Sequence, residues 1–489
     1  MHRVFILSIV FFFLAFCAGA VNVKSADELI ALFSDSSVTL VVDEINLLND
    51  IDFSGTSLTL PLGTWPGDYC VPYGGVFHGN GHSIKGLSIN NQTSSVRGGA
   101  GLFCTLDNAT VMDLVIDSSC SFQGKNAGAL GAFVRTSVCV INVTNQAHVQ
   151  GSSTSGGFIG LIEQQKEENT ISFERCTNNG TIDGGDYIGG FVGHIRHSNN
   201  TNVVFKSSTN NGTISGKAAG GLIGFVESNT NLSLHVEGCI NNDIVQGNNG
   251  FTAGFIGEIE CSGKTQSVTL LISDSTNNGN LSTDAYSVCG MFCVDSDYNH
   301  NVNTTVYNSI NKGSVQGKSS SAAAYGITND ITMARSVVSM SSVIGSSESH
   351  SFWKVSNDVE MFYGLKTECK KCDEDGATVF ERNPSNGLYT MIGSGERVDE
   401  KLNKQAEMEK YGAMWTYDLS LSTKYVSVTA GKPVNGKLIV DSVNPLDKLV
   451  NLCSVFMGQC TIVNQQTKKP IQEPSLITDG ISVSFCFNV

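Results

Sequence analysis

The chain has 489 residues, a formal net charge of −15 and only 15% charged residues, with no basic stripe along it. Nucleic-acid binding needs clustered Lys and Arg that release phosphate counterions, so this composition excludes it as a function. The length allows the chain to build its own hydrophobic core without a dense disulfide framework.

The N-terminus has the pattern of a secretory signal over residues 1–20. A basic start (His2, Arg3) precedes an apolar run from Val4 to Phe16, and Ala18-Gly19-Ala20 supplies a cleavage site. That run is too short for a membrane span, and no later stretch has eighteen apolar residues. We therefore expect a secreted or vesicle-lumen protein with no transmembrane segment.

Cysteines and glycosylation sequons agree with this route. Of fifteen cysteines, Cys17 lies in the signal, which leaves an even number for an oxidising compartment. Nine Asn-x-Ser/Thr sequons are candidate glycosylation sites: Asn91, Asn108, Asn142, Asn179, Asn199, Asn211, Asn231, Asn280 and Asn303.

Residues 21–50 are expected to form an N-terminal cap and a first strand. An apolar i, i+3, i+4 pattern predicts a short helix within 21–34, which would cover the open sheet edge. Val38–Leu48 and Ser57–Leu62 are predicted strands. Gly74–Asn90 and Ala100–Asp117 are then the opening coils of a repeating region over 51–350.

A seven-residue phrase recurs through this region about every thirty-three residues. It reads GALGAFV (Gly128–Val134), GGFIGLI (Gly156–Ile162), GGFVGHI (Gly189–Ile195), GGLIGFV (Gly220–Val226), AGFIGEI (Ala253–Ile259) and CGMFCVD (Cys289–Asp295). A fixed period of this kind is typical of stacked coils that bury their apolar faces against their neighbours. The fold class is predicted to be all-β, a right-handed parallel β-helix (β-solenoid).

A second phrase, typified by NNGTIDG, follows roughly twenty residues after each first one. Each coil should hold three short strands: the first phrase, an alternating segment such as ISFERC, and the brief TIDG. The Asn-Asn-Gly between the last two is predicted to be a tight turn with positive φ. The first Asn of each should stack as an inward ladder about 4.8 Å per coil: Asn145, Asn178, Asn210, Asn241, Asn277 and Asn311.

The residues beside this ladder carry two further expectations. The second Asn of the turn, as in Asn179 and Asn211, should point outward with its sequon. Cys176 and Cys239 lie two coils apart, about 10 Å, which exceeds the reach of a disulfide. They are predicted to be small buried ladder residues.

The segment from Ile51 to Ser336 resembles the Gly-Leu-x-Gly (GLUG) repeats of large secreted and surface proteins of bacteria and protists. The resemblance rests on GGVFHGNGHSIKGLSIN, GGAGLFCTLDNATVMDLVID and the repeated GGFIG and GGLIG. It implies a β-solenoid with a role in adhesion or surface display. Some related solenoids are extracellular proteases or polysaccharide-active enzymes with a further catalytic domain, and no recognisable catalytic domain is attached here.

Residues 351–489 differ in composition and are expected to form a small α+β or β module. A charged helix is predicted over Val398–Gly412, and strands over Lys424–Val443 and Ile481–Val489. Its Cys-x-x-Cys motif has three interpretations: a redox pair, half of a zinc site, or structural disulfides. The last is favoured, with five candidate cysteines: Cys369, Cys372, Cys453, Cys460 and Cys486.

Catalytic and metal motifs were weighed along the repeats. A polysaccharide lyase or hydrolase needs carboxylates with Arg or Lys on one coil face. The candidates are Asp183 with Asp186, Asp295 with Asp297, Glu163 with Glu167 and Glu168, and the basic Arg175, Arg196 and Arg335. None of these carboxylates is expected to recur in neighbouring coils at a matching position, and the arginines fall at different coil positions and are expected to be solvated. His194 and His197 lack a third zinc ligand, so no metal and no cofactor is predicted.

Three functional hypotheses remain open. The first is a non-enzymatic secreted or cell-surface protein that binds glycans or cell-surface proteins. The second is a polysaccharide lyase or hydrolase, which requires three or more carboxylates with Arg or Lys close together on one coil face. The third is a structural coat or wall component. The sequence does not indicate the oligomeric state.

Overall fold

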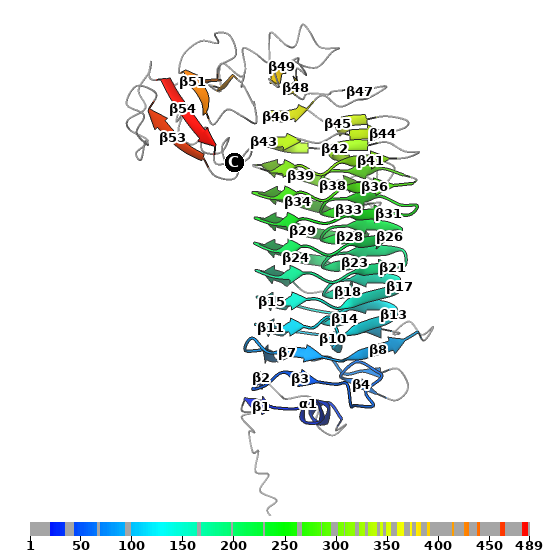
Figure 1. Ribbon diagram of the computed structural model, residues 1–489. Coiled ribbons are helices and arrows are strands. Elements are labelled where there is room, and N and C mark those ends of the chain that lie inside the picture. The colour runs from blue at the N-terminus through cyan, green and yellow to red at the C-terminus, as the bar shows by residue number, and fades with distance from the viewer. Residues whose placement is uncertain are drawn as a thin grey trace, which may run out of the picture.

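The computed structural model describes residues 20–34, 44–65, 69–92, 99–163, 168–196, 199–227, 230–261, 267–284, 286–294, 302–307 and 309–317. Residues 65, 69, 307 and 310, and the strands beyond 317, are described by their backbone alone. The described part is a β-solenoid in which parallel rungs stack into a column, with one short helix at its N-terminal end (Figure 1).

Two long parallel sheets form the column, and we call them sheet A and sheet B. The principal rungs of sheet A are β2 (Glu44–Leu47), β6 (Val76–His78), β11 (Ala109–Met112), β15 (Val138–Ile141), β19 (Asn169–Glu174), β24 (Asn199–Lys206), β29 (Thr230–Glu237), β34 (Val268–Ser273), β39 (Val302–Tyr307), β43 (Ile331–Ser339) and β46 (Val359–Leu365). Each pairs in parallel with the next.

Sheet B contains two such series of rungs. The first is β8 (Ser88–Asn91), β13 (Ser121–Gly128), β17 (His148–Gly156), β21 (Ile182–Gly184), β26 (Ile214–Gly216), β31 (Val245–Gly247), β36 (Leu281–Thr283), β41 (Val315–Gly317) and β44 (Val343–Gly345). The second is β10 (Phe103–Leu106), β14 (Gly131–Val134), β18 (Ile159–Glu163), β23 (Val192–Arg196), β28 (Ile223–Glu227), β33 (Ile256–Glu260), β38 (Phe292–Val294), β42 (Ala322–Ile327) and β45 (Ser349–Trp353).

Shorter strands fill the coil between these rungs. In sheet A they are β3 (Ile51–Asp52), β7 (Ser83–Lys85), β12 (Val115–Ile116), β16 (Thr144–Asn145), β20 (Thr177–Asn178), β25 (Thr209–Asn210), β30 (Ile240–Asn241), β35 (Thr276–Asn277) and β40 (Ile310–Asn311). In sheet B they are β9 (Gly99–Ala100), β22 (Tyr187–Gly189), β27 (Ala218–Gly220), β32 (Thr252–Ala253) and β37 (Val288–Cys289). A complete coil thus runs β19, β20, β21, β22, β23.

Alternation along each strand builds the core. In β19 the residues Ile171 and Phe173 are fully buried, while the residues between them are partly exposed. Equivalent aromatic rings stack from coil to coil: Phe173 lies over Phe205 with ring centroids 5.1 Å apart and nearly parallel planes. Burial of these columns of Phe, Ile and Val is the main stabilising force of the solenoid.

A buried ladder of asparagine amides runs inside the column. Each Nδ2 donates to the Oδ1 of the equivalent residue on the next coil, at 2.7–2.8 Å, from Asn145 through Asn178, Asn210, Asn241 and Asn277 to Asn311. All six side chains are fully buried. These bonds satisfy polar groups that would otherwise be costly to bury.

A second amide ladder lies on the outside, one residue further along. Asn211 Nδ2 donates to Asn179 Oδ1 at 2.9 Å, Asn242 Nδ2 to Asn211 Oδ1 at 2.8 Å, and Asn278 Nδ2 to Asn242 Oδ1 at 2.7 Å. Its members are exposed, so water competes for the same bonds.

The expected positive-φ turn at Asn-Asn-Gly is wrong. The left-handed residue lies three positions before the ladder Asn, at Asn142, Arg175, Ser207, Gly238 and Asp274. The Gly after each Asn pair has another role. A Cβ on Gly212 would lie 1.9 Å from Gly180 O and 2.8 Å from Asn178 Nδ2, so glycine lets the coils approach around the ladder.

The recurring seven-residue phrase is a corner and not a single strand. In Gly189–Ile195 the first Gly ends β22, Gly190 and Phe191 form the break, and Val192 begins β23. A Cβ on Gly190 would lie 2.1 Å from Gly221 O, which explains the glycine pair. The break turns Phe191 into the core, where it is fully buried.

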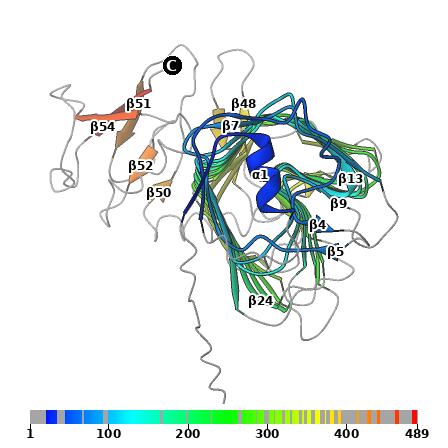
Figure 2. The ribbon, with the colours of Figure 1, turned by 90° about the horizontal axis from the view of Figure 1, so that it is seen from below.

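The N-terminal cap contains the one short helix expected within residues 21–34. Helix α1 spans Ala26–Leu32, and its N-cap Ser25 Oγ accepts a hydrogen bond from the backbone N–H of Glu28. It lies across the end of the column (Figure 2) and packs Leu29 into the core. The preceding β1 (Val21–Val23) pairs with β2 and is the terminal rung of sheet A.

Of the two strands predicted at this end, the first is present in its described part and the second needs correction. The described part of Val38–Leu48 begins at residue 44 as β2. Residues 57–61 form no strand, and Leu62 makes only an isolated bridge to Phe103. Pro61 has no N–H to donate, which interrupts a ladder at this point. A short antiparallel pair follows, β4 (Thr64–Trp65) with β5 (Tyr69–Cys70).

At the C-terminal side, parallel pairing continues past residue 350 into β46, β47 (Cys372–Asp373) and β48 (Thr378–Arg382), and β48 pairs antiparallel with β49 (Tyr389–Met391). A separate five-stranded sheet contains β50 (Ala413–Met414), β51 (Tyr425–Thr429), β52 (Leu438–Val440), β53 (Cys460–Asn464) and β54 (Ser482–Phe487). The helix predicted over Val398–Gly412 lies outside the described residues.

Candidate functional site

A row of outward polar residues crosses three neighbouring rungs of sheet A. Thr170 on β19, Asn202 on β24 and Ser233 on β29 are direct neighbours in the parallel register. They alternate with buried residues such as Val203, which face the core. The strand period therefore fixes these side chains on the outer surface, one coil apart.

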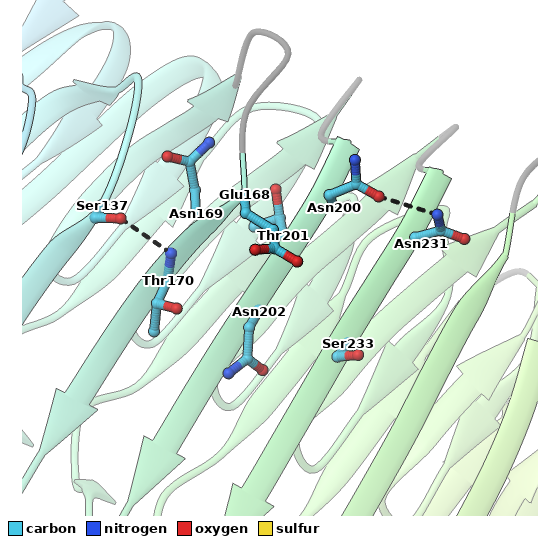
Figure 3. A pocket seen from close by; sticks show the side chains of 9 residues that line it. All are labelled: Ser137, Glu168, Asn169, Thr170, Asn200, Thr201, Asn202, Asn231 and Ser233. Carbon is cyan, nitrogen blue, oxygen red and sulfur yellow. Dashed lines mark hydrogen bonds between the residues drawn. The ribbon is translucent and has the colours of Figure 1, made fainter.

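These residues form the floor of a groove of about 440 Å³ at the start of the rungs. We call it the polar groove (Figure 3). Its lining residues are Ser137, Glu168, Asn169, Thr170, Asn200, Thr201, Asn202, Asn231 and Ser233. Hydroxyl and amide side chains make up this lining except for the single carboxylate of Glu168.

Hydrogen bonds between coils fix the rim of the polar groove. Asn231 Nδ2 donates to Asn200 Oδ1 at 2.9 Å, and the Thr170 backbone N–H donates to Ser137 Oγ at 3.1 Å. Ser267 Oγ donates to Asn231 Oδ1 at 3.0 Å. The rim amides are thus pre-oriented and lose little conformational entropy on binding.

Asn202 presents an acceptor that no described residue satisfies. Its Oδ1 is buried, and among the described residues it has no hydrogen-bond partner. An unsatisfied buried acceptor costs about 1–3 kcal/mol. That oxygen is closed to solvent, so a ligand would contact the accessible hydroxyl and amide groups of the lining instead. The polar groove can therefore bind a neutral, hydroxyl-rich molecule, and it holds no nucleophile–base pair for catalysis among the described residues.

Sheet B carries a second cluster, which we call the glutamate–arginine row. It consists of Glu163, Arg196, Glu227 and Glu260, which are register neighbours on β18, β23, β28 and β33. Arg196 Nη2 lies 3.3 Å from the Glu163 carboxylate. The register neighbour of Glu163 is Arg196 and not a carboxylate, as expected, but two glutamates that were not candidates, Glu227 and Glu260, are neighbours at the same position on the next two coils. The Arg196 side chain is one third exposed, so it is partly solvated.

Aromatic rings lie beside this row. His194 is 3% exposed, and its Nε2 lies 3.1 Å from Glu227 Oε2. Tyr187 packs on His194 and stacks on Phe225, with ring centroids 4.6 and 4.3 Å apart. Burial, followed by the negative charge of Glu258 and its neighbours, raises the pKa of Tyr187 to about 12. The phenol is therefore protonated at neutral pH and available as a hydrogen-bond donor.

The other candidate charged residues are paired and dispersed. Asp183 lies 2.9 Å from His148 Nε2, Asp186 lies 3.5 Å from Lys217 Nζ, and Arg175 contacts Glu174. Glu168 lines the polar groove instead of joining Glu163. The remaining candidates, Glu167, Asp295, Asp297, His197 and the Arg335 side chain, lie outside what the structure describes.

The sequons differ in how they are presented. Asn108, Asn142, Asn179, Asn211, Asn231, Asn280 and Asn303 are exposed, and Asn199 is half-buried. Asn91 is 7% exposed, and its Nδ2 donates to Gly99 O at 3.1 Å. In this fold Asn91 is the least suited of the nine to carry a glycan.

Two disulfides are present among the described residues, Cys70–Cys104 and Cys289–Cys293. Neither pair was singled out from the sequence. Cys176 and Cys239 are buried free thiols, and their backbone N–H groups donate to the serines of the next coil, Ser208 and Ser275. The side chains of the five C-terminal candidates, Cys369, Cys372, Cys453, Cys460 and Cys486, lie outside the described residues.

The described residues offer no candidate for a metal site or for a membrane-spanning helix. In the described coils no three His, Cys, Asp or Glu side chains are grouped so that they could hold a metal ion. Within the same residues, no helix has the length and apolar character needed to cross a bilayer.

No family model matches this chain, and no curated protein is significantly similar to it. Among solved structures, one similar chain is a candidate immunoglobulin A1 protease from Bacteroides ovatus. It has a TM-score of 0.39 and 15% sequence identity, and the match covers 69% of this chain and 84% of that chain. A similarity of this extent says nothing about activity.

Proposed function

We propose that this chain is a secreted or cell-surface glycoprotein that binds carbohydrate through the polar groove without catalysing a reaction. The observation that carries the proposal is the lining of hydroxyl and amide groups, with a single carboxylate, that neighbouring coils present in the polar groove. Sugars present many hydroxyl donors and few charges, which matches such a lining. The N-terminal signal pattern and the exposed sequons support an extracellular location.

An array of neutral and acidic glycans, probed with residues 21–489 made in a non-glycosylating host, tests this proposal. We expect binding to neutral glycans. Asn202→Ala should weaken it about 2- to 12-fold, because a hydrogen bond contributes about 0.5–1.5 kcal/mol. Ser215→Ala is the matched control, since Ser215 is a partly exposed polar residue on a strand of sheet B. Absence of neutral-glycan binding, or equal affinity of all three proteins, would refute the proposal.

A second candidate function is hydrolysis of a polysaccharide at the glutamate–arginine row. Three carboxylates and one arginine on consecutive rungs supply the arrangement that such an enzyme needs. Rungs are spaced about 4.8 Å apart, and paired catalytic carboxylates lie about 5–9.5 Å apart in glycosidases. Release of reducing sugar that disappears in Glu227→Gln would favour this function over simple binding.

A further inference from the structure

The rim of the polar groove carries a glycosylation sequon. Asn231, Leu232 and Ser233 form Asn-x-Ser, and both Asn231 and Ser233 line the groove. Leu232 between them is buried in the core. The position of the sequon means that a sugar on Asn231 begins inside the site and not beside it.

The amide of Asn231 is held in one orientation by its neighbours on both sides. Its Oδ1 accepts from Ser267 Oγ on the coil above. Its Nδ2 donates to Asn200 Oδ1 on the coil below, as Figure 3 shows. An Asn side chain has two Nδ2 hydrogens, and glycosylation replaces one of them. The modified amide keeps one N–H, so the bond to Asn200 can persist and continue to orient the attached sugar.

We propose that Asn231 is N-glycosylated and that the first sugar of this glycan occupies the polar groove, so that the modification closes the groove to external carbohydrate. The chemical match is the one already described: the floor row of Thr170, Asn202 and Ser233 offers hydroxyl and amide groups to a neutral sugar. The claim that the glycan blocks external carbohydrate rests on the proposed function. The claim that the first sugar occupies the polar groove does not.

The modification is a glycosyl transfer to Asn231 from a lipid-linked oligosaccharide diphosphate, and its bonds balance. The bond from sugar C1 to the diphosphate oxygen breaks, the bond from C1 to Asn231 Nδ2 forms, and the displaced Nδ2 proton leaves as the diphosphate departs. Transfer precedes folding, so the core sugar is present when the rungs assemble around the groove.

The seating of the glycan is tested by enzymatic release from the folded protein. The full chain is secreted from a eukaryotic host, its occupied sites are mapped by mass spectrometry, and glycans are released with a peptide N-glycosidase under native conditions. The matched control is Asn280, which is exposed, lies outside the groove, and stands in an identical Asn-Leu-Ser sequon. We expect release from Asn231 to be at least about tenfold slower than from Asn280 when folded, and equally fast after denaturation.

An unmodified Asn231, or equal native release rates at the two sites, would overturn the inference. The closing of the groove is measured separately, with the same chain made in a non-glycosylating host. We expect neutral-glycan binding by the unmodified chain and its loss in the glycosylated one. If Asn231 is protected but the unmodified chain binds no glycan, the seating stands and the proposed function fails. If both forms bind equally, the closing of the groove fails.

Discussion

The buried asparagine ladder yields the sharpest prediction about stability. Asn210 Nδ2 donates to Asn241 Oδ1 at 2.8 Å and to Gly212 O at 2.9 Å, and its Oδ1 accepts from Asn178 Nδ2 at 2.8 Å. In Asn210→Ala the acceptors Asn241 Oδ1 and Gly212 O lose this donor. Each buried unsatisfied group costs about 1–3 kcal/mol, so we expect a destabilisation of about 2–6 kcal/mol.

The neighbouring residue provides a matched control. Asn211 makes two amide–amide bonds of similar length, to Asn179 and from Asn242, but it is exposed. Water replaces both bonds in Asn211→Ala, so the free energy of unfolding should change by no more than about 0.5 kcal/mol. The pair therefore differs in burial and not in the number of ladder bonds.

Hydrogen exchange followed by mass spectrometry is the suitable assay, because repeat proteins can open coil by coil and depart from two-state unfolding. Peptides covering residues 199–220 report the opening free energy of the affected coil. The proteins are made without glycosylation, since Asn211 lies in a sequon. Equal effects of the two substitutions, or a loss below 1 kcal/mol for Asn210→Ala, would refute the reasoning.

Three further predictions concern corners, thiols and surface charge. Gly190→Ala should lower the free energy of unfolding in urea by about 1–3 kcal/mol, because the new Cβ would lie 2.1 Å from a carbonyl oxygen. Gly55→Ala is the control and should leave the stability unchanged, because nothing lies within 4 Å of its Cβ position. Burial raises the pKa of the Cys176 thiol to about 12, so iodoacetamide at pH 8 should label it only after unfolding; labelling of the native protein would contradict this. The hydrogen-bonded Lys85 ammonium holds the pKa of Asp50 below its usual value. The resulting stabilisation is present above the pKa that Asp50 has in the unfolded chain, and it is lost as pH falls through the pKa of Asp50 in the folded protein. Lys85→Met should raise the Asp50 pKa in an NMR titration. An unchanged Asp50 pKa would count against the pairing.

Spacing in the sequence was sufficient to predict the solenoid and the place of each ladder Asn, because stacking repeats one environment every coil. It did not locate the left-handed corner. That corner holds Arg175 and Ser207 as well as Gly238. A non-glycine residue in this conformation costs only about 1–2 kcal/mol, which the cross-coil hydrogen bonds of the same turn outweigh. Residue type is therefore a weak predictor of the left-handed conformation at this corner.

The candidate sites were harder to predict than the fold. The polar groove combines residues about thirty positions apart, and outward polar residues follow no pattern stricter than alternation with the core. The glutamate–arginine row did leave a signal: the residue after the second to fifth of the six seven-residue phrases is Glu163, Arg196, Glu227 and Glu260 in turn. Comparing that position across coils, instead of comparing loops, would have found it.

The two amide ladders point in opposite directions along the column. Inside, each amide donates toward the C-terminal end, from Asn178 to Asn210, and outside each donates toward the N-terminal end, from Asn211 to Asn179. Each ladder of aligned amide dipoles therefore runs beside a ladder of opposite direction, one residue away in the sequence, and the electric fields of the two ladders largely cancel. Over the coils from Asn179 to Asn278, where both ladders are present, added coils therefore contribute little net axial dipole from these side chains.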